Sequence, residues 1–172
     1  MPVVYKGGRV LKRSFGRLMS ILHRQSQVYI NCSLKEFGIT SAEYSFLLYL
    51  YKKNGATQDD MSCYLYIDKA ATARAVQSLE QKGYVTKCKD QADKRFNRIF
   101  LTDKARAHKE EIWRRIRCWS DFLTEGIDEA TAGVVIDTLE KMVERVEDTN
   151  FTKTLEESRH EKFKPSGQRK NT

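Results

Sequence analysis

Basic side chains are concentrated in the middle third of the chain, where they could bind a string of phosphates. Between residues 67 and 102 the sequence has eight lysines and arginines against four aspartates and glutamates. A solvated surface without a partner would carry the two signs in closer balance. Within a chain of net charge +8, this excess favours a polyanionic partner. Charge alone does not distinguish DNA from RNA, acidic protein or anionic lipid.

Two short helices supply part of this basic segment. Thr57 suits the N-cap of the first and Asp68 that of the second, which ends before Gly83. The tight link between them predicts a helix-turn-helix, whose second helix fits the major groove of B-form DNA. Its core face would carry Ala71, Ala75, Val76 and Leu79. Its polar face would present Lys69, Thr72, Arg74 and Gln77 to phosphates and base edges.

A β-hairpin is predicted after these helices. Residues 84–88 and 96–101 are rich in β-branched and aromatic side chains, and a polar segment separates them. The basic residues at or near its tip are Lys89, Lys94, Arg95 and Arg98. A narrow minor groove concentrates negative potential and would hold an inserted arginine, for which we expect Arg95.

Long amphipathic helices flank this region and set the domain organisation. The first runs to a stop at Gly38, and a second helix follows a capping box formed by Thr40 and Glu43. The expected fold is mainly α with a small β-hairpin wing, in the order four helices, two strands, two helices. We expect a winged helix-turn-helix lobe over residues 39–101, a helical dimerisation region over 9–38 and 102–148, and a polar tail over 149–172.

The apolar stripes of the flanking helices are too long for the DNA-binding lobe to cover, so their burial requires a second copy of the chain. The residues expected at this interface are Leu11, Phe15, Leu18, Ile116, Trp119, Leu123, Leu139, Met142 and Val146. A dimer would place two second helices about 34 to 36 Å apart, which predicts a pseudo-palindromic duplex operator.

Other chemistry is poorly supported. Cys32, Cys63, Cys88 and Cys118 are too far apart for a zinc motif, and we expect reduced structural thiols. The histidines His23, His108 and His160 are dispersed, so no metal or other cofactor is expected. Without a nucleophile beside a base, a phosphate-cradling loop or paired carboxylates, an enzyme is not expected. No apolar run reaches the roughly 20 residues of a membrane span, which favours a cytoplasmic protein without membrane contact.

The central segment resembles the MarR (multiple-antibiotic-resistance regulator) family of winged-helix transcriptional regulators, and the similarity spans Leu18 to about Val146. The matching motifs are Ile67-Asp68-Lys69, Arg74-Ala75-Val76, Leu79 to Val85 with Lys82-Gly83-Tyr84, Asp93-Lys94-Arg95 and Leu101-Thr102. The resemblance implies that Arg95 contacts the minor groove and that Asp93 orients it. It also implies a homodimer built from the first, fifth and sixth helices.

A repressor relieved by a small aromatic effector is the function that this resemblance favours. The effector would lie between the dimerisation and DNA-binding lobes, near aromatic residues such as Tyr44, Tyr49, Tyr51, Trp113 and Trp119. Ala70, Ala71 and Ala73 depart from the family, whose recognition helix often carries hydroxyl groups there, so Thr72 would supply that group.

Three alternatives remain open. A winged-helix adaptor would bind protein instead of DNA, and an architectural protein would bind every duplex alike without an effector. Cys88 and Cys118 could serve as redox sensors, as cysteines do in some relatives. The reactive cysteine of the family's peroxide sensors lies early in the first helix, whereas Cys32 falls near the end of that helix, so this motif does not carry over.

Overall fold

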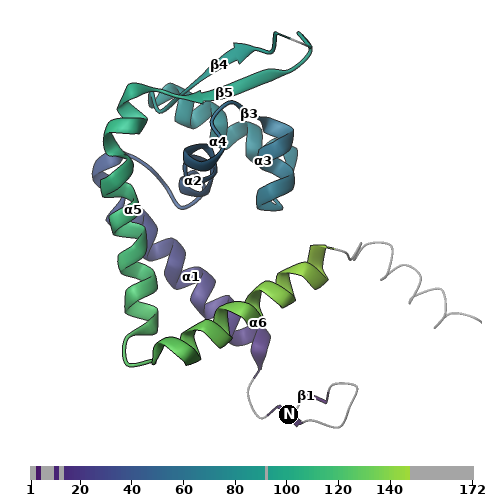
Figure 1. Ribbon diagram of the computed structural model, residues 1–172, viewed down its shortest axis with the longest axis vertical. Coiled ribbons are helices and arrows are strands. Elements are labelled where there is room, and N and C mark those ends of the chain that lie inside the picture. Colours follow the sequence, from purple (N-terminus) through teal and green to yellow (C-terminus); the bar gives the residue numbers. More distant parts are fainter. Residues whose placement is uncertain (1–2, 5–9, 12–13, 92, 148–172) are drawn as a thin grey trace, which may run out of the picture. The chain divides into compact units, whose positions relative to one another are not determined.

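The computed structural model describes residues 3–4, 10–11, 14–91 and 93–147, with side chains for 14–91 and 93–146. The chain forms two compact units, residues 1–123 and residues 124–172. Figure 1 shows the elements, which are, in chain order, β1 (Val3–Val4), β2 (Val10–Leu11), α1 (Phe15–Ser33), η1 (Lys35–Phe37), α2 (Tyr44–Lys52), β3 (Ala56–Thr57), α3 (Gln58–Leu65), α4 (Lys69–Gln81), β4 (Val85–Lys89), β5 (Asn97–Leu101), α5 (Asp103–Thr124) and α6 (Glu129–Glu147).

The first helix begins later than predicted. The Ser14 side chain caps α1 by accepting a hydrogen bond from the backbone N–H of Arg17 at 3.3 Å. Leu11, which we expected on the apolar stripe of this helix, lies in β2 and pairs with Val3 of β1. The helical spacing of apolar residues extends from Leu11 across Ser14, which suggested an earlier start. The Ser14 hydroxyl accepts from an N–H group of the first turn, and this cap sets the N-terminal boundary of α1. Gly38 ends the short 3₁₀ helix η1 with a φ of 66°.

The start of α2 also differs from the prediction. Thr40 and Glu43 do interact, but the Glu43 carboxylate accepts both the Thr40 N–H, at 2.8 Å, and the Thr40 hydroxyl, at 2.9 Å. The hydroxyl is therefore a donor and does not cap a helix. The helix proper begins four residues later, at Tyr44.

The predicted helix-turn-helix is confirmed, together with both of its caps. Thr57 and Asp60 form a reciprocal capping box at the start of α3. The Asp60 N–H donates to the Thr57 hydroxyl at 3.1 Å, and the Thr57 N–H donates to the Asp60 carboxylate at 2.8 Å. Asp68 caps α4 by accepting from the Ala71 N–H at 2.8 Å. Between the helices, Tyr66 adopts a left-handed conformation with a φ of 53°.

The sheet has three strands instead of the predicted two, in the order β3-β5-β4. Ala56 of β3 pairs with Ile99, and the hairpin β4–β5 is in the register that places Val85 opposite Leu101. A two-residue strand is too short to show a β periodicity in the sequence, so β3 was missed. Gly55 allows β3 to approach β5 closely, because a Cβ at this position would lie 2.8 Å from Cε1 of Phe100.

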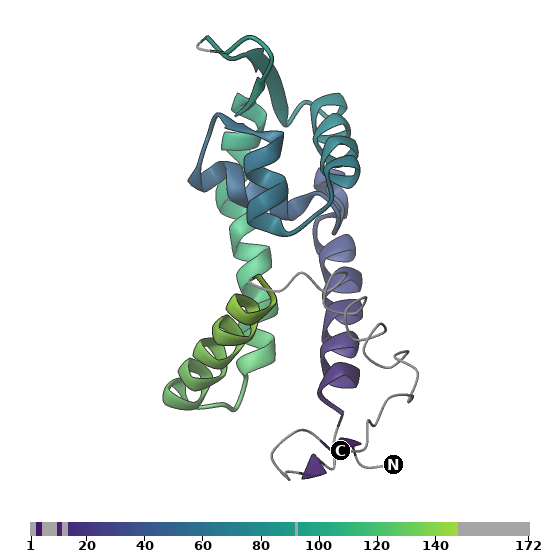
Figure 2. The same ribbon diagram turned by 90° about the vertical axis from the view of Figure 1, so that its right-hand side faces the viewer.

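One buried core unites α1 to α5 within the first unit. Phe46, Leu50, Val76, Ile99 and Ile112 are among its fully buried members. The second half of α1 packs on the middle of α5, where the Tyr29 and Trp119 rings stack at 5.1 Å and the Tyr29 hydroxyl donates to the Arg115 carbonyl at 2.8 Å. Figures 1 and 2 show that the remaining lengths of α1 and α5 extend away from the lobe that carries α2, α3, α4 and the sheet.

The helix α6 belongs to the second unit. Asp128 caps it, because its carboxylate accepts the Thr131 N–H at 3.0 Å and the Thr131 hydroxyl at 2.6 Å. The polar tail predicted over residues 149–172 lies outside the described residues.

Candidate nucleic-acid interface

The helix α4 has one face toward the core and an opposite face open to solvent. Three of its four predicted groove residues, Lys69, Arg74 and Gln77, are exposed, and Ala70 and Ala73 lie on the same side. The buried residues are Thr72, Ala75, Val76 and Leu79. Their spacing of three, one and three residues is that of a single helical stripe.

The prediction for Thr72 is wrong. Its side chain is fully buried, with 0% exposure, and its hydroxyl has no hydrogen-bond partner among the described residues. Thr72 lies four residues before Val76 and seven before Leu79, so it shares their core face, whereas Ala71 is partly exposed. Its polar type suggested the groove, but its methyl group and its phase on the helix place it in the core.

The exposed end of α4 is linked to α3. The Lys69 ammonium lies 2.9 Å from the Asp59 carboxylate, and both side chains are exposed. An exposed pair of this kind is weak and screened by salt. The ammonium can therefore exchange Asp59 for a phosphate at little cost.

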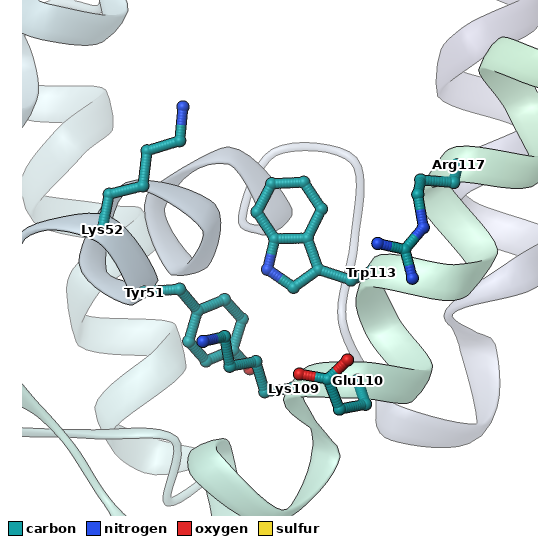
Figure 3. A pocket seen from close by; sticks show the side chains of 6 residues that line it. All are labelled: Tyr51, Lys52, Lys109, Glu110, Trp113 and Arg117. Atoms are coloured by element: carbon teal, nitrogen blue, oxygen red, sulfur yellow. The ribbon is translucent and has the colours of Figure 1, made fainter.

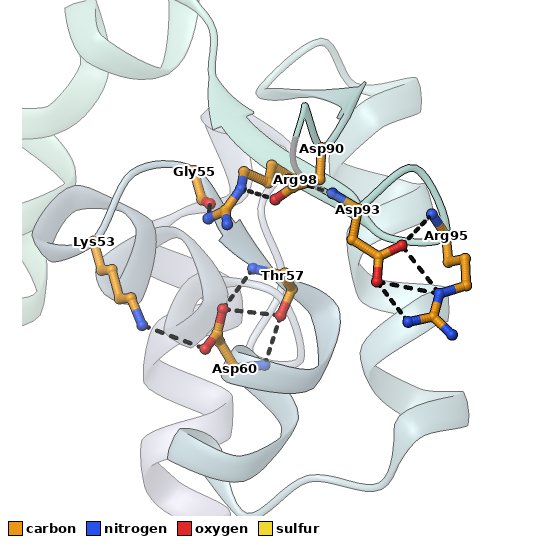
Figure 4. A network of polar contacts seen from close by, with 8 residues as sticks. All are labelled: Lys53, Gly55, Thr57, Asp60, Asp90, Asp93, Arg95 and Arg98. Carbon is orange, nitrogen blue, oxygen red and sulfur yellow. Dashed lines mark hydrogen bonds and ion pairs between the residues drawn. The ribbon is translucent and has the colours of Figure 1, made fainter.

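The tip of the hairpin is organised around Asp93 and Arg95 (Figure 4). The Asp93 carboxylate accepts from Arg95 Nε at 3.0 Å, from Arg95 Nη2 at 2.7 Å and from the Arg95 backbone N–H at 3.0 Å. These hydrogen bonds from Arg95 hold the pKa of the Asp93 carboxyl below its usual range. The orienting contact expected between the two residues is present, and the Arg95 side chain remains 84% exposed.

Arg98 makes contacts within the chain that the sequence did not predict. Its Nε donates to the Asp90 carboxylate and its Nη1 to the Gly55 carbonyl, the latter at 3.0 Å, so it braces the hairpin against the end of β3 (Figure 4). The other Asp90 oxygen accepts from the Asp93 N–H at 3.1 Å. Arg98, Asp90 and Asp93 thus connect the sheet to Arg95. The Arg98 side chain is still 47% exposed, so its expected contact with DNA stays a prediction beside this support of the wing.

The remaining basic residues of the hairpin differ in exposure and in ion pairing. Lys89 and Lys94 are exposed, as predicted for phosphate contact. Lys87 is held 2.6 Å from Glu80 of α4. Two residues of this tip were not singled out from the sequence: Asp90, which accepts from Arg98, and Phe96, an exposed aromatic ring directly after Arg95. A phenylalanine beside the expected insertion residue was the available signal.

A cavity of about 310 Å³ lies between α2 and α5, and Figure 3 shows its lining side chains. They are Tyr51, Lys52, Lys109, Glu110, Trp113 and Arg117. Tyr51 donates its hydroxyl to the Ala105 carbonyl at 2.8 Å, and burial raises the pKa of this phenol. Of the five aromatic residues expected around an effector, Tyr51 and Trp113 line this cavity.

The other three expected effector residues do not line it. Tyr49 is buried and its ring lies 4.6 Å from that of Tyr64, while Trp119 stacks on Tyr29. Tyr44 is partly buried against the core. Core packing therefore accounts for Tyr44 and Tyr49, and ring stacking on α1 accounts for Trp119.

The residues predicted for dimerisation are largely accessible in a single chain. Phe15, Leu18, Leu123, Leu139 and Val146 are exposed. Trp119 and Met142 are partly exposed, and Ile116 packs at the edge of the core. The side chain of Leu11 lies outside the described residues.

We expected the cysteines to be structural thiols, but none of the four lies in the core. Cys32, Cys63, Cys88 and Cys118 are free and exposed. Of the histidines, His108 packs against Tyr84 with 3.3 Å between Nδ1 and the hydroxyl oxygen, His23 is exposed, and His160 lies outside the described residues.

Metal clusters and membrane-spanning helices are both absent from the described ranges. There, no group of three or more histidine, cysteine, aspartate or glutamate side chains is placed to hold a metal ion. None of the helices resolved in those ranges is both long and apolar enough to span a bilayer.

Comparisons with known proteins agree with this geometry. The MarR family profile matches residues 37–95, from η1 to the wing tip. The crystal structure of a MarR transcriptional regulator from Methanosarcina mazei Go1 is 35% identical, covers 76% of this chain and 94% of its own, and superposes with a TM-score of 0.72. The HTH-type transcriptional regulator BilQ of Clostridioides difficile is 27% identical over 64% of this chain and 74% of its own length. A MarR-family regulator from Listeria monocytogenes, solved with 26mer DNA, shares the fold at 23% identity with a TM-score of 0.75, covering 79% of this chain and 91% of its own.

Proposed function

Because the chain belongs to the MarR family of DNA-binding transcriptional regulators, we propose that it binds a specific duplex operator as a homodimer and represses transcription until a small aromatic anion binds. The observation that carries the proposal is Arg95, an exposed guanidinium held by Asp93 at the tip of a wing beside an exposed, basic helix face.

The described surfaces support a division of roles in DNA binding. Arg74 and Gln77 of α4 are exposed and can make bidentate hydrogen bonds to base edges in the major groove. Lys69, Lys89 and Lys94 supply phosphate contacts, which add affinity without sequence information. Arg95 enters the adjacent minor groove. Thr72 has no place in this set, because it is buried, and Arg98 contributes mainly by bracing the wing from which Arg95 extends.

Dimerisation is supported by apolar faces that one chain leaves open. Phe15, Leu18 and Leu22 are exposed along α1, and Val135, Leu139, Val143 and Val146 along α6. A large apolar side chain is worth roughly 1.5 to 3 kcal/mol when fully buried. Covering these two stripes and the end of α5 with the same surfaces of a second copy would make the dimer obligate. We assign residues 39–101 to DNA binding and residues 9–38 and 102–148 to this interface.

The cavity between α2 and α5 supports the effector. Three basic side chains and one carboxylate, Glu110, line it, so its charge is positive on balance. The rings of Tyr51 and Trp113 provide apolar walls, and the combination suits an aromatic carboxylate. Such a ligand relieves repression only if it favours a dimer whose α4 helices no longer match successive major grooves. A dimer on an operator of about two helical turns blocks a promoter that overlaps it, which is why repression is proposed.

Selection of bound fragments from the source genome, followed by footprinting, tests the proposal directly. We expect a pseudo-palindromic site that is preferred over unrelated duplex by roughly a thousandfold. The slope of log K against log salt should be about −0.9 for each phosphate neutralised. Equal affinity for all duplexes would indicate an architectural protein, and the absence of salt-dependent binding would indicate an adaptor.

The oligomeric state and the effector are tested separately. Analytical ultracentrifugation at micromolar concentration should show a dimer, and a folded monomer would contradict the interface. Salicylate, used as the probe, should lower operator affinity in the wild-type chain and should do so less in Lys109→Ala. The matched control Arg106→Ala removes an exposed basic side chain of α5 that lies outside the cavity.

A further inference from the structure

Phe96 is an apolar ring at the polar tip of the wing. It is 43% exposed, although it directly precedes β5 and could turn toward the sheet. A single exposed phenylalanine is ordinary in itself. Its fixed position and its neighbour make this one different.

The backbone of Phe96 closes the tip loop on both sides. Its N–H donates to the Asp93 carbonyl at 3.0 Å, and its carbonyl accepts from the Asp90 N–H at 3.1 Å. The same two aspartates are the ones that organise Arg95 and Arg98. The backbone of Phe96 is therefore held by the same two aspartates that position Arg95 and Arg98, and its ring projects from this fixed backbone.

The ring also lies beside the Arg95 guanidinium. Arg95 Cζ is 5.8 Å from the centre of the Phe96 ring, within the range of a cation–π contact. Arg95 uses Nε and Nη2 for Asp93, and the Phe96 ring lies near the same guanidinium, most of which stays exposed. Whatever surface accepts the guanidinium must therefore also meet the ring.

We propose that Phe96 is a second DNA contact of the wing, whose ring packs on the deoxyribose wall of the minor groove beside the inserted Arg95. The proposal rests on the proposed function. The walls of a minor groove about 6 Å wide present sugar C–H groups, which suit an aromatic ring, whereas the floor presents hydrogen-bond acceptors, which suit arginine. The ring meets a wall only when the groove is narrow, so Phe96 makes the wing selective for groove width.

A double-mutant cycle with Arg95→Ala and Phe96→Ala tests this assignment. Burying the exposed part of the ring predicts a loss of about fivefold in operator affinity per wing for Phe96→Ala. The salt slope should stay unchanged in Phe96→Ala, because no charge is lost, and should fall by about 0.9 per wing in Arg95→Ala. Phe96→Leu, which keeps an apolar side chain, should recover most of the affinity.

Measurements in the Arg95→Ala background distinguish a direct contact of Phe96 with the groove from mere support of Arg95. If Phe96 touches the groove wall, Phe96→Ala should still weaken binding when Arg95 is already alanine. If Phe96 only holds Arg95, it should have no effect in that background, and the proposal would be overturned. Replacing A·T by G·C pairs under the wing, which widens the groove, should penalise Phe96→Ala less than the wild-type chain.

Two controls keep this result separate from the proposed function and from folding. Thr86→Ala changes an exposed side chain on β4 and should leave binding unchanged. Thermal midpoints of all variants should match the wild type, because these side chains are exposed. Wild-type binding with undiminished binding by Phe96→Ala overturns only this inference, whereas failure of the wild type to bind any duplex overturns the proposed function.

Discussion

Lys82 Nζ donates to both carboxylate oxygens of Glu43, at 2.6 and 2.7 Å. Glu43 is only 4% exposed and precedes α2, and Lys82 forms the C-cap of α4. The ion pair therefore ties the C-terminal end of α4 to the body of its lobe. Because a buried charge is costly without its partner, this link is sensitive to a change on either side.

We predict that Glu43→Gln lowers the free energy of unfolding by about 2 kcal/mol, since it leaves the half-buried Lys82 ammonium without its counter-charge. Urea unfolding followed by circular dichroism measures the change. Asp59→Asn is the matched control, because it breaks the exposed pair with Lys69 and should cost less than about 0.5 kcal/mol. Equal effects of the two variants would contradict the special role of Glu43.

The same pair predicts a pH dependence. Burial acts to raise the pKa of Glu43, but hydrogen bonds from Lys82, Ser78 and Thr40 outweigh it and hold the pKa below its ordinary value. A carboxyl with a lowered pKa in the folded state contributes stability above its ordinary pKa of about 4.3 and loses it as the pH falls through the folded value. The stability gap between wild type and Glu43→Gln should be constant above about pH 5.5 and should close at lower pH.

Thr72→Val tests the corrected orientation of α4. Valine has the shape of threonine without the unpartnered buried hydroxyl, so we expect the variant to be more stable by about 1 kcal/mol. Operator affinity should stay unchanged, because the side chain does not reach the groove. Thr72→Ala, which leaves a small void, should be less stable than Thr72→Val. A loss of DNA affinity by Thr72→Val at undiminished stability would return Thr72 to the interface.

Local signals predicted most of the fold. Thr57 and Asp68 cap their helices as expected, because each cap depends on neighbouring backbone groups only. Some of the errors arose where a distant contact decides the outcome. Glu43 pairs with Lys82, 39 positions away, and β3 exists only because β5 lies beside it. The Ser14 cap of α1 and the Thr40–Glu43 contact are local and were misjudged nonetheless.

The candidate site shows the same division. Arg95 and Asp93 are two residues apart, and their contact could be expected from the motif that they form. Arg98 was assigned to DNA by charge alone, and its partners Asp90 and the Gly55 carbonyl lie eight and 43 positions away. To place Thr72 correctly, one must know which face of α4 packs against the core, and a single sequence does not reveal that.

Gly55→Ala should damage the support of the wing. Gly55 has a φ of 83°, and an added Cβ would lie 2.8 Å from the Phe100 ring, so we expect a loss of roughly 3 kcal/mol in the free energy of unfolding. Gly38→Ala is the control, because its φ of 66° carries the same backbone strain with nothing within 4 Å of the new Cβ. Its cost should be about 1 kcal/mol, which is the strain alone. Similar losses in the two variants would mean that the approach of Phe100 does not matter.

Asp93→Asn separates the orientation of Arg95 from its charge. Asparagine cannot hold the guanidinium through two anionic oxygens, so Arg95 should spend more time away from the groove, and operator affinity should fall about fivefold. The lost negative charge acts in the opposite direction, since it removes a repulsion from the phosphates and should raise affinity for unrelated duplex. The specificity ratio should therefore fall more than the operator affinity itself.

Salt dependence identifies the cause of that loss. Asp93→Asn keeps Arg95, so its salt slope should not become shallower than that of the wild type, whereas Arg95→Ala should lose about 0.9 in slope per wing. Asp103→Asn removes an equal charge from the exposed first turn of α5 and should leave the specificity ratio unchanged. If Asp93→Asn also kept the wild-type ratio, Arg95 would reach the groove without its carboxylate partner, and the Asp93 contact would serve only to close the tip of the wing.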